Sequence, residues 1–198
     1  MFERVKQNLE ANGFAVSVFA SGEEAAAYLN RTIDGVTVGM GGSMTLAQLG
    51  LRESLGAHNT LYCHGFTPGD PVQVQQLAAG AEIYLLSANG LAETGEIINI
   101  DGVGNRLASS LYGHKKVCFV IGRNKLAPDF HSALHRARNT AAPQNARRLG
   151  RKPPCAAKGD RCYDCSSPER ICRGLAVHYR PMLRTETEVI LIDQELGY

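Results

Sequence analysis

The segment GVTVGMGGSMT, residues 35–45, contains a strand, a turn and the start of a helix. Residues 35–39 have the composition of a short β-strand, and the glycine-rich run from Met40 to Thr45 follows directly. Residues 46–55 then have the apolar spacing of a helix that ends near Gly56. A strand that leads through a tight turn into a helix is typical of α/β proteins.

The same alternation continues on both sides of this segment. Strand-like runs are expected at residues 14–19, 60–63, 82–87, 96–100 and 116–122, and helices at 2–12, 21–30, 71–79 and 105–112. Strands that alternate with helices at this spacing predict an α/β fold, with a mostly parallel sheet and helices on both faces. At 198 residues, the chain is expected to form a single domain.

The last third of the chain has a different composition. Residues 128–148 predict an arginine-rich helical stretch that is interrupted at Pro143. Residues 149–175 hold three prolines and four cysteines but almost no large apolar side chains, so they cannot build a core of their own. Two strand-like runs, 176–182 and 188–193, follow, and we expect them to pair with each other at a sheet edge.

Four cysteines in this segment predict a metal centre. Cys155, Cys162, Cys165 and Cys172 form the pattern C-x6-C-x2-C-x6-C, in which a central C-x2-C pair can place two sulfurs on one metal. Metal ligation would also supply the folding energy that residues 150–175 lack. Disulfides or free thiols are the alternatives. A single C-x2-C pair slightly favours an iron–sulfur cluster over zinc, because zinc sites usually contain two such pairs.

Charge and hydropathy indicate where in the cell the protein is located and which kinds of molecule it binds. No apolar run reaches the roughly 18 residues that span a bilayer, and the first residues do not resemble an export signal, so a cytoplasmic protein is expected. The formal net charge is +2, but residues 115–198 hold 16 basic and 8 acidic side chains. Because no aromatic residues are interleaved among the basic ones from Arg136 to Lys152, nucleic acid is not the expected partner.

Two glycine-rich loops predict a pocket for a small carboxylate or phosphate. The loop at residues 39–45 ends at a helix start, and a second loop at 88–106 follows a buried strand. Loops beyond the carboxyl ends of parallel strands converge on one crevice, and helix N-termini favour anions. The alternative is that both loops are ordinary turns. The residues expected to line the pocket are Gly41, Gly42, Ser43, Thr45, Glu93, Thr94, Asn105 and Arg106.

Four motifs carry a resemblance to a known family. GGSMT (41–45), AETGEI (92–97), DGVGNR (101–106) and CFVIGRNKL (118–126) together resemble the LUD-domain family of lactate-utilisation proteins. The resemblance implies the α/β architecture of ribose-5-phosphate isomerases, glucosamine-6-phosphate deaminases and CoA transferases. It also implies a link to the oxidation of lactate to pyruvate alongside iron–sulfur partner subunits.

By position, the resemblance assigns residues 41–45 to an anion-binding glycine loop, and Glu93, Thr94 and Gly95 to an acidic E-T-G turn. Glu96 departs from the family pattern, which has a small polar residue there. The cysteine segment also lies outside the core family pattern, and it suggests a separate branch whose substrate need not be lactate.

Three functions remain open from the sequence. The first is a subunit of a lactate-oxidising, iron–sulfur-dependent complex. The second is a stand-alone isomerase or transferase acting on a sugar phosphate or acyl group, with Glu93 as base or nucleophile and with Arg106 and Lys125 as electrostatic partners. The third is a non-catalytic binding module of a redox complex. The first two functions allow catalysis by this chain and the third excludes it, so the sequence is compatible with an enzyme and with a non-enzyme.

Overall fold

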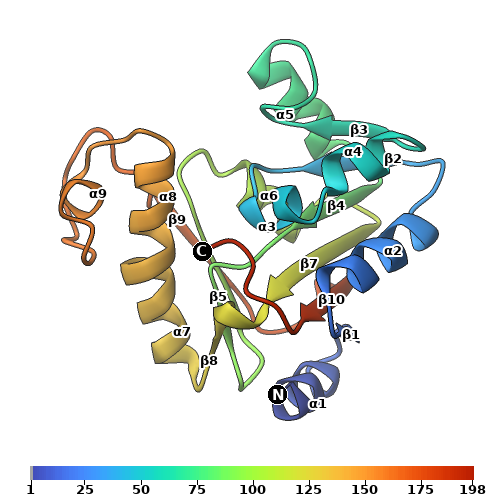
Figure 1. The fold of residues 1–198 in the computed structure, drawn as a ribbon, viewed down its shortest axis with the longest axis horizontal. Coiled ribbons are helices and arrows are strands. Elements are labelled where there is room, and N and C mark those ends of the chain that lie inside the picture. Colours follow the sequence, from blue (N-terminus) through green and yellow to red (C-terminus); the bar gives the residue numbers. More distant parts are fainter. Residues whose placement is uncertain (1) are drawn as a thin grey trace.

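The computed structural model describes residues 2–198 and is built around a six-stranded parallel sheet (Figure 1). Its strands run in the order β1-β10-β7-β4-β2-β3. Their bounds, in that order, are Ala15–Phe19, Glu186–Ile192, Lys116–Gly122, Ile83–Leu86, Thr37–Met40 and Thr60–Cys63. The predicted α/β class, with a mostly parallel sheet, is confirmed.

Helices cover both faces of this sheet. One face carries α2 (Gly22–Thr32), α3 (Met44–Gln48) and α4 (Leu51–Gly56), and the other carries α1 (Glu3–Ala11) and α5 (Pro71–Ala79). The central strands are apolar on both sides: in β7, Cys118 and Val120 face the first set, whereas Val117, Phe119 and Ile121 face the second. The sequences of such strands are continuous apolar runs, because both faces of the strand are buried.

A second sheet lies beside the first and extends its core. It has the order β8-β5-β6-β9, with bounds Leu126–Ala127, Gly90–Ala92, Ile97–Asp101 and Gly174–His178. Leu91 and Ile97 pack into the same apolar cluster as β7, and Ile98 and Ile100 pack with Ala133 and neighbouring residues. α6 (Asn105–Leu111) follows β6, and the 3₁₀ turn η1 (Arg123–Lys125) follows β7.

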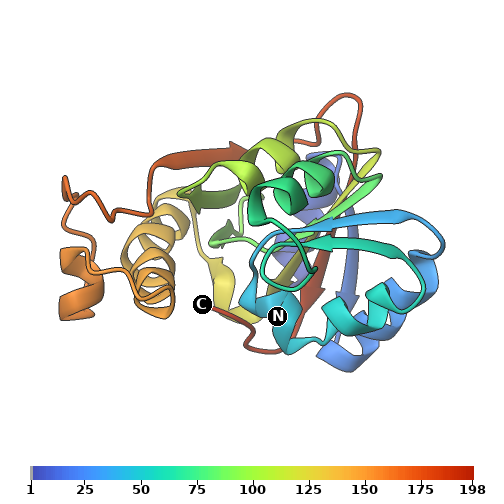
Figure 2. The ribbon, with the colours of Figure 1, turned by 90° about the horizontal axis from the view of Figure 1, so that it is seen from above.

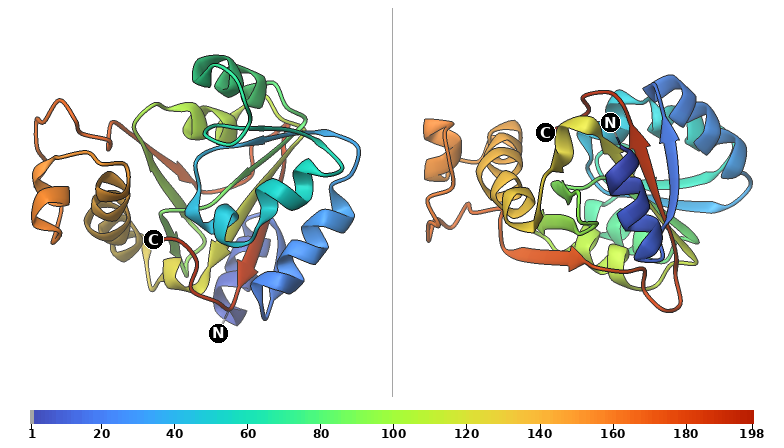
Figure 3. Two further views of the ribbon diagram at one scale, coloured as in Figure 1. Left: turned by 45° about the horizontal axis from the view of Figure 1, so that its top comes forward. Right: turned by 90° about the horizontal axis from the view of Figure 1, so that it is seen from below.

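The arginine-rich stretch forms one long helical rod on the outer side of the second sheet (Figures 1 and 2). It comprises α7 (Phe130–Arg136), the π-helical turn η2 (Ala137–Ala141) and α8 (Ala142–Arg148). The predicted interruption at Pro143 is therefore wrong. A π turn directly before the proline shifts the hydrogen-bond register around its missing N–H, so the rod continues. The short helix α9 (Pro154–Lys158) and the coil after it lie outside α8 (Figure 3).

Two further expectations need correction. The single helix expected at 46–55 is divided into α3 and α4 by Gly50, whose φ is +63°. The two last strands do not pair with each other: β9 is at the edge of the second sheet, whereas β10 lies inside the first, between β1 and β7. The apolar run from Val189 to Ile192 fits this central position, because it is fully buried.

Across residues 2–198, the structure contains no helix with both the length and the apolar character needed to cross a membrane.

Candidate anion-binding site

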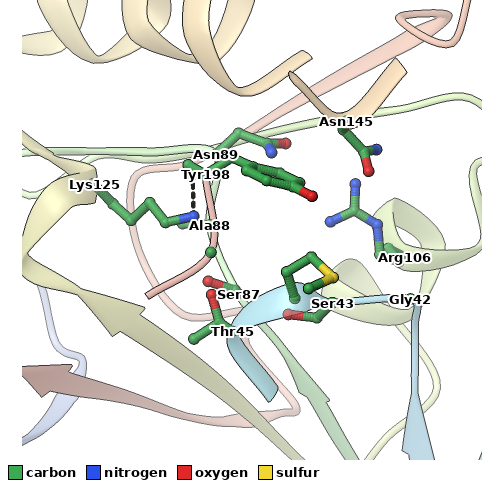
Figure 4. A pocket seen from close by; sticks show the side chains of 12 residues that line it. Gly42, Ser43, Thr45, Ser87, Ala88, Asn89, Arg106, Lys125, Asn145 and Tyr198 are labelled. Carbon is green, nitrogen blue, oxygen red and sulfur yellow. Dashed lines mark hydrogen bonds between the residues drawn. The ribbon is translucent and has the colours of Figure 1, made fainter. Parts of the chain in front are cut away.

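Three neighbouring strands of the first sheet end at one small cavity. The loop after β2 contributes Gly42, the segment after β4 contributes Ser87 and Asn89, and the turn after β7 contributes Lys125 (Figure 4). Because β7, β4 and β2 are adjacent and parallel, their carboxyl ends bring these residues to one edge. The cavity has a volume of about 40 Å³. Ser43 caps α3 at this place, since its hydroxyl accepts a hydrogen bond from the Leu46 amide at 3.3 Å.

Arg106 is held at this cavity by two residues at the end of β6, and a glycine makes room for it. Its guanidinium donates to the carbonyl of Ile100 at 2.7 Å, and its Nε lies 3.4 Å from a carboxylate oxygen of Asp101. A Cβ atom at Gly41 would lie 2.5 Å from Cγ of Arg106. Glycine at position 41 therefore makes the room that Arg106 occupies.

Lys125 is the second cation of the cavity, and it is almost fully buried. Its ammonium group donates to the backbone oxygen of Tyr198. Among the described residues, it forms no ion pair with a carboxylate side chain. Burial, and to a smaller extent the nearby positive charges of Arg136 and Arg106, lower the pKa of Lys125 to about 7. Lys125 can therefore gain or lose a proton near neutral pH.

The segment that ends at Tyr198 forms one wall of the cavity. The Tyr198 ring points towards Arg106, and Asn89 and Asn145 line the same cavity (Figure 4). Arg136 fixes this wall, because its Nη1 donates to the carbonyls of Asn89 at 2.6 Å and Tyr198 at 3.2 Å. The sequence did not single out Asn89, Asn145 or Tyr198.

The small cavity adjoins a wide basic cleft of about 640 Å³, and the two share Gly42, Asn89, Arg106 and Asn145. The cleft runs between the carboxyl edge of the first sheet and the cysteine segment. Its cations are Arg52, His64, Arg106, Arg148, Arg151, Arg170 and Arg173, with His64 counted only when it is protonated. The two acidic residues in its lining are both engaged: Asp101 contacts Arg106, and Glu169 accepts a hydrogen bond from the Lys152 amide at 3.0 Å.

The predicted site residues are only partly brought together. Gly42, Ser43, Thr45, Arg106 and Lys125 line the small cavity, and Asn105 lines the cleft. Gly41 lies behind Arg106.

The acidic turn lies elsewhere, so the prediction of one pocket shared by both loops is corrected for Glu93, Thr94 and Gly95. Glu93 forms an ion pair with Arg4 of α1 at 3.5 Å, and the hydroxyl of Thr94 donates to Glu96. A Cβ at Gly95 would lie 2.6 Å from the side chain of Asn12. The turn therefore packs against α1, because the strands on either side of it belong to the second sheet.

The four cysteines of the C-terminal segment line one very small cavity. Cys155, Cys162, Cys165 and Cys172 surround a volume of about 10 Å³, and all four are free thiols. Burial raises the pKa of the Cys155 thiol, and the nearby thiols of Cys165 and Cys172 raise it further. Within residues 2–198, no three or more His, Cys, Asp or Glu side chains are already spaced as a ligand set for a metal ion.

Fold and site together define an α/β protein with a cationic pocket at the carboxyl edge of a parallel sheet. The model of the LUD domain matches residues 2–192, so the chain belongs to the LUD-domain family. A solved structure of a DUF162 family protein from Deinococcus radiodurans is similar in fold, with 12% sequence identity and a TM-score of 0.56 over 96% of this chain and 94% of that one. A search among curated proteins finds no match.

Proposed function

We propose that this protein binds a small organic anion, a carboxylate or a phosphate ester, at Arg106 and Lys125, and that it serves lactate utilisation together with iron–sulfur partner subunits. Family membership supports the metabolic setting. The properties of the cavity support the class of ligand.

The observation that carries the proposal is an excess of positive charge in a small cavity. Arg106 and Lys125 both reach the small cavity, and no acidic side chain is among the described residues that line it. Arg106 is paired with Asp101, but Lys125 is a buried cation without a carboxylate side-chain partner among the described residues. Such a group is costly, and an anionic ligand would offset that cost. The hydroxyl of Ser87, at the same cavity, has no hydrogen-bond partner within residues 2–198. A ligand oxygen can supply that partner.

The sizes of the two spaces suggest how a ligand divides between them. The cavity of about 40 Å³ suits a single carboxylate or phosphate group, whereas the cleft of about 640 Å³ has room for the rest of a larger molecule. A short 2-hydroxy or 2-oxo acid would occupy the inner cavity alone. A phosphate ester would place its organic part among the arginines of the cleft.

The alternative of a stand-alone isomerase or transferase has less support. It assigned the role of base or nucleophile to Glu93, which is paired with Arg4 away from the cavity. Asp101 is the acid nearest to Arg106 in the cleft, and its oxygens accept hydrogen bonds from the amides of Gly102, at 2.7 Å, and Arg106, at 3.1 Å. A carboxylate held in this way serves as a positioning group rather than as a free base.

Calorimetric titration of pyruvate, L-lactate and ribose 5-phosphate tests the class of ligand. We expect at least one of them to bind, and we expect Arg106→Gln to weaken that binding about tenfold or more, because a charged hydrogen bond contributes about 1.5–3 kcal/mol. Arg4→Gln removes the same charge outside the cleft and should bind like the wild type. The ligand class is wrong if none of the three anions binds, or if Arg106→Gln binds as tightly as the wild type.

The metabolic setting needs a separate test. A strain that lacks this protein should grow slowly with lactate as its sole carbon source and normally with pyruvate. Equal growth on both carbon sources would contradict the role in lactate utilisation, but it would not contradict anion binding at Arg106 and Lys125.

A further inference from the structure

The cysteine segment has local features of a thiolate metal site beyond its spacing. Cys162 Sγ accepts a hydrogen bond from the amide of Asp164 at 3.3 Å. Asp164 has a φ of +43°, and among the described residues it is the only non-glycine residue with a positive φ. This conformation turns the C-x2-C loop so that an amide points at the sulfur, and hydrogen bonds to the sulfurs are what tune thiolate-bound metals.

Positive charge surrounds the four thiols. Arg138 and Arg170 line the same cavity, and Arg138 lies 3.9 Å from Cys162 Sγ. Arg170 donates to the carbonyl of Cys165 at 2.7 Å and to that of Cys172 at 2.8 Å. Four thiolates on a divalent metal carry a net negative charge, and these two guanidinium groups would offset part of it.

The same segment holds the wall of the anion cleft. Arg170 and Ile171 line both the thiol cavity and the cleft. A Cβ at Gly102 would lie 2.8 Å from the carbonyl of Ile171, so the two backbones are in close contact. The Arg173 amide donates to the carbonyl of Asp101 at 2.9 Å, and the carboxylate of Asp101 accepts from the amide of Arg106 at 3.1 Å. A continuous path of contacts therefore joins the cysteines to Arg106.

We propose that Cys155, Cys162, Cys165 and Cys172 bind one metal centre as thiolates, and that this centre fixes the loop from Asp101 to Arg106 at the anion cleft. Each thiol loses its proton when it ligates, so loading a divalent ion releases up to four protons to solvent and involves no change of oxidation state. The sulfurs line one cavity without yet forming a ligand set, and the metal supplies the energy that draws them together.

Thiolate donors favour soft metals, and a set of four cysteines is typical of structural zinc and of iron–sulfur clusters. A cavity of about 10 Å³ has the size of a single ion, around which the sulfurs need only move inward, whereas a cluster would require the coil after α9 to open around it. The metal centre does not depend on the proposed anion ligand, and its test uses none.

Metal analysis of anaerobically purified protein is the first part of the test. We expect one centre per chain, either zinc alone or iron with acid-labile sulfide, and the absorption spectrum distinguishes the two. Cys162→Ser and, separately, Cys165→Ser should lose it, whereas the control Cys118→Ala removes a buried thiol of β7 and should keep it. A wild-type protein that takes up neither zinc nor iron with sulfide, and whose four segment thiols stay titratable, overturns the metal site.

Hydrogen exchange of the backbone amides is the second part. The amides of Gly102 and Arg106 both bond to the Asp101 carboxylate, so their exchange reports on the loop at the cleft. We expect these amides to exchange about fivefold faster or more in Cys162→Ser than in the metal-loaded wild type, which is the lower end of typical coupling between sites. Amides of β7 serve as an internal control for global unfolding. Equal exchange of the loop in both proteins overturns the link to the cleft, even if the metal is present.

Discussion

Replacing Lys125 with methionine should make pyruvate binding insensitive to pH near neutrality. Lys125 is buried at the anion cavity, and its pKa is lowered to about 7 by burial first and by the charges of Arg136 and Arg106 second. The group is therefore cationic below neutral pH and becomes neutral as the pH rises through 7. An anion at this site interacts favourably with the protonated form, so its affinity should decrease as the pH rises.

The size of the effect follows from this pKa. A base with a pKa of about 7 is about nine tenths protonated at about pH 6 and about one tenth protonated at about pH 8. If binding requires the cation, the apparent Kd for pyruvate rises about tenfold over this range, or about 1.4 kcal/mol. Pyruvate is suited to the test because its carboxylate stays ionised throughout, whereas a phosphate ester changes its own charge near pH 6.

The assay is calorimetry at several pH values, in buffers of different ionisation enthalpy. At about pH 8 the wild type should take up close to one proton as pyruvate binds, because the ligand raises the pKa of Lys125. Lys125→Met should bind weakly, with the same Kd at both ends of the range and no proton uptake. His64 lines the wall of the cleft, and the control variant His64→Gln should keep the pH dependence. Proton uptake that persists in Lys125→Met, or a pH-independent wild type, refutes the assignment.

Two further changes give direct tests. Gly41→Ala should displace Arg106, whose Cγ lies 2.5 Å from the new methyl position, and weaken pyruvate binding about tenfold. The control Gly56→Ala lies outside the cavity, where the new methyl meets only Leu61 at 3.5 Å, and it should bind normally in the same titration. Glu188, almost fully buried in β10, has a pKa held low by hydrogen bonds from Lys116 and two hydroxyl groups, which outweigh the effect of burial. The stability that comes from this lowered pKa is present above the pKa of the unfolded state, about 4.3, and is lost as the pH falls through the pKa of the folded state. Glu188→Ala should therefore lower the free energy of unfolding by about 3 kcal/mol at neutral pH, and by less below about pH 4. Urea titrations that show an equal loss at both pH values would contradict this.

Local sequence signals were sufficient for most elements of the first sheet. The helix at 71–79 and the strands at 60–63 and 116–122 lie where their patterns predict, because caps, prolines and apolar runs act within a few residues. Sheet order is a different kind of information. Nothing near residues 186–192 indicates that this strand lies between β1 and β7, since its partners are distant in the chain. The second sheet was not predicted for a different reason. Two of its strands, β5 and β8, are only three and two residues long, which is too short to give a recognisable pattern.

The residues of the candidate site also differ in whether a local sequence signal could predict them. The glycine loop and Arg106 could be predicted, because a loop after a buried strand and a helix start are both visible locally. Glu93 was misplaced because a loop at a strand end points to the crevice only if the strand belongs to the parallel sheet, and β5 does not. Asn89 had a usable signal, since it stands three residues after Leu86 of the buried strand β4. Tyr198 had none, because it reaches the cavity through tertiary contacts alone.

The central position of β10 sets the order in which this protein can fold. β1 pairs with β10 and with no other strand of the described chain, and Ser17 of β1 bonds to Glu188 of β10 across 171 positions of sequence. During synthesis, β1 therefore leaves the ribosome well before its partner and must wait, unpaired, until residues 20–185 have followed. Contacts this distant in sequence make the final closure slow. If the chain is cut anywhere between β9 and β10, so that β10 is missing, β1 should become disordered as well, although β1 and β10 are far apart in the sequence.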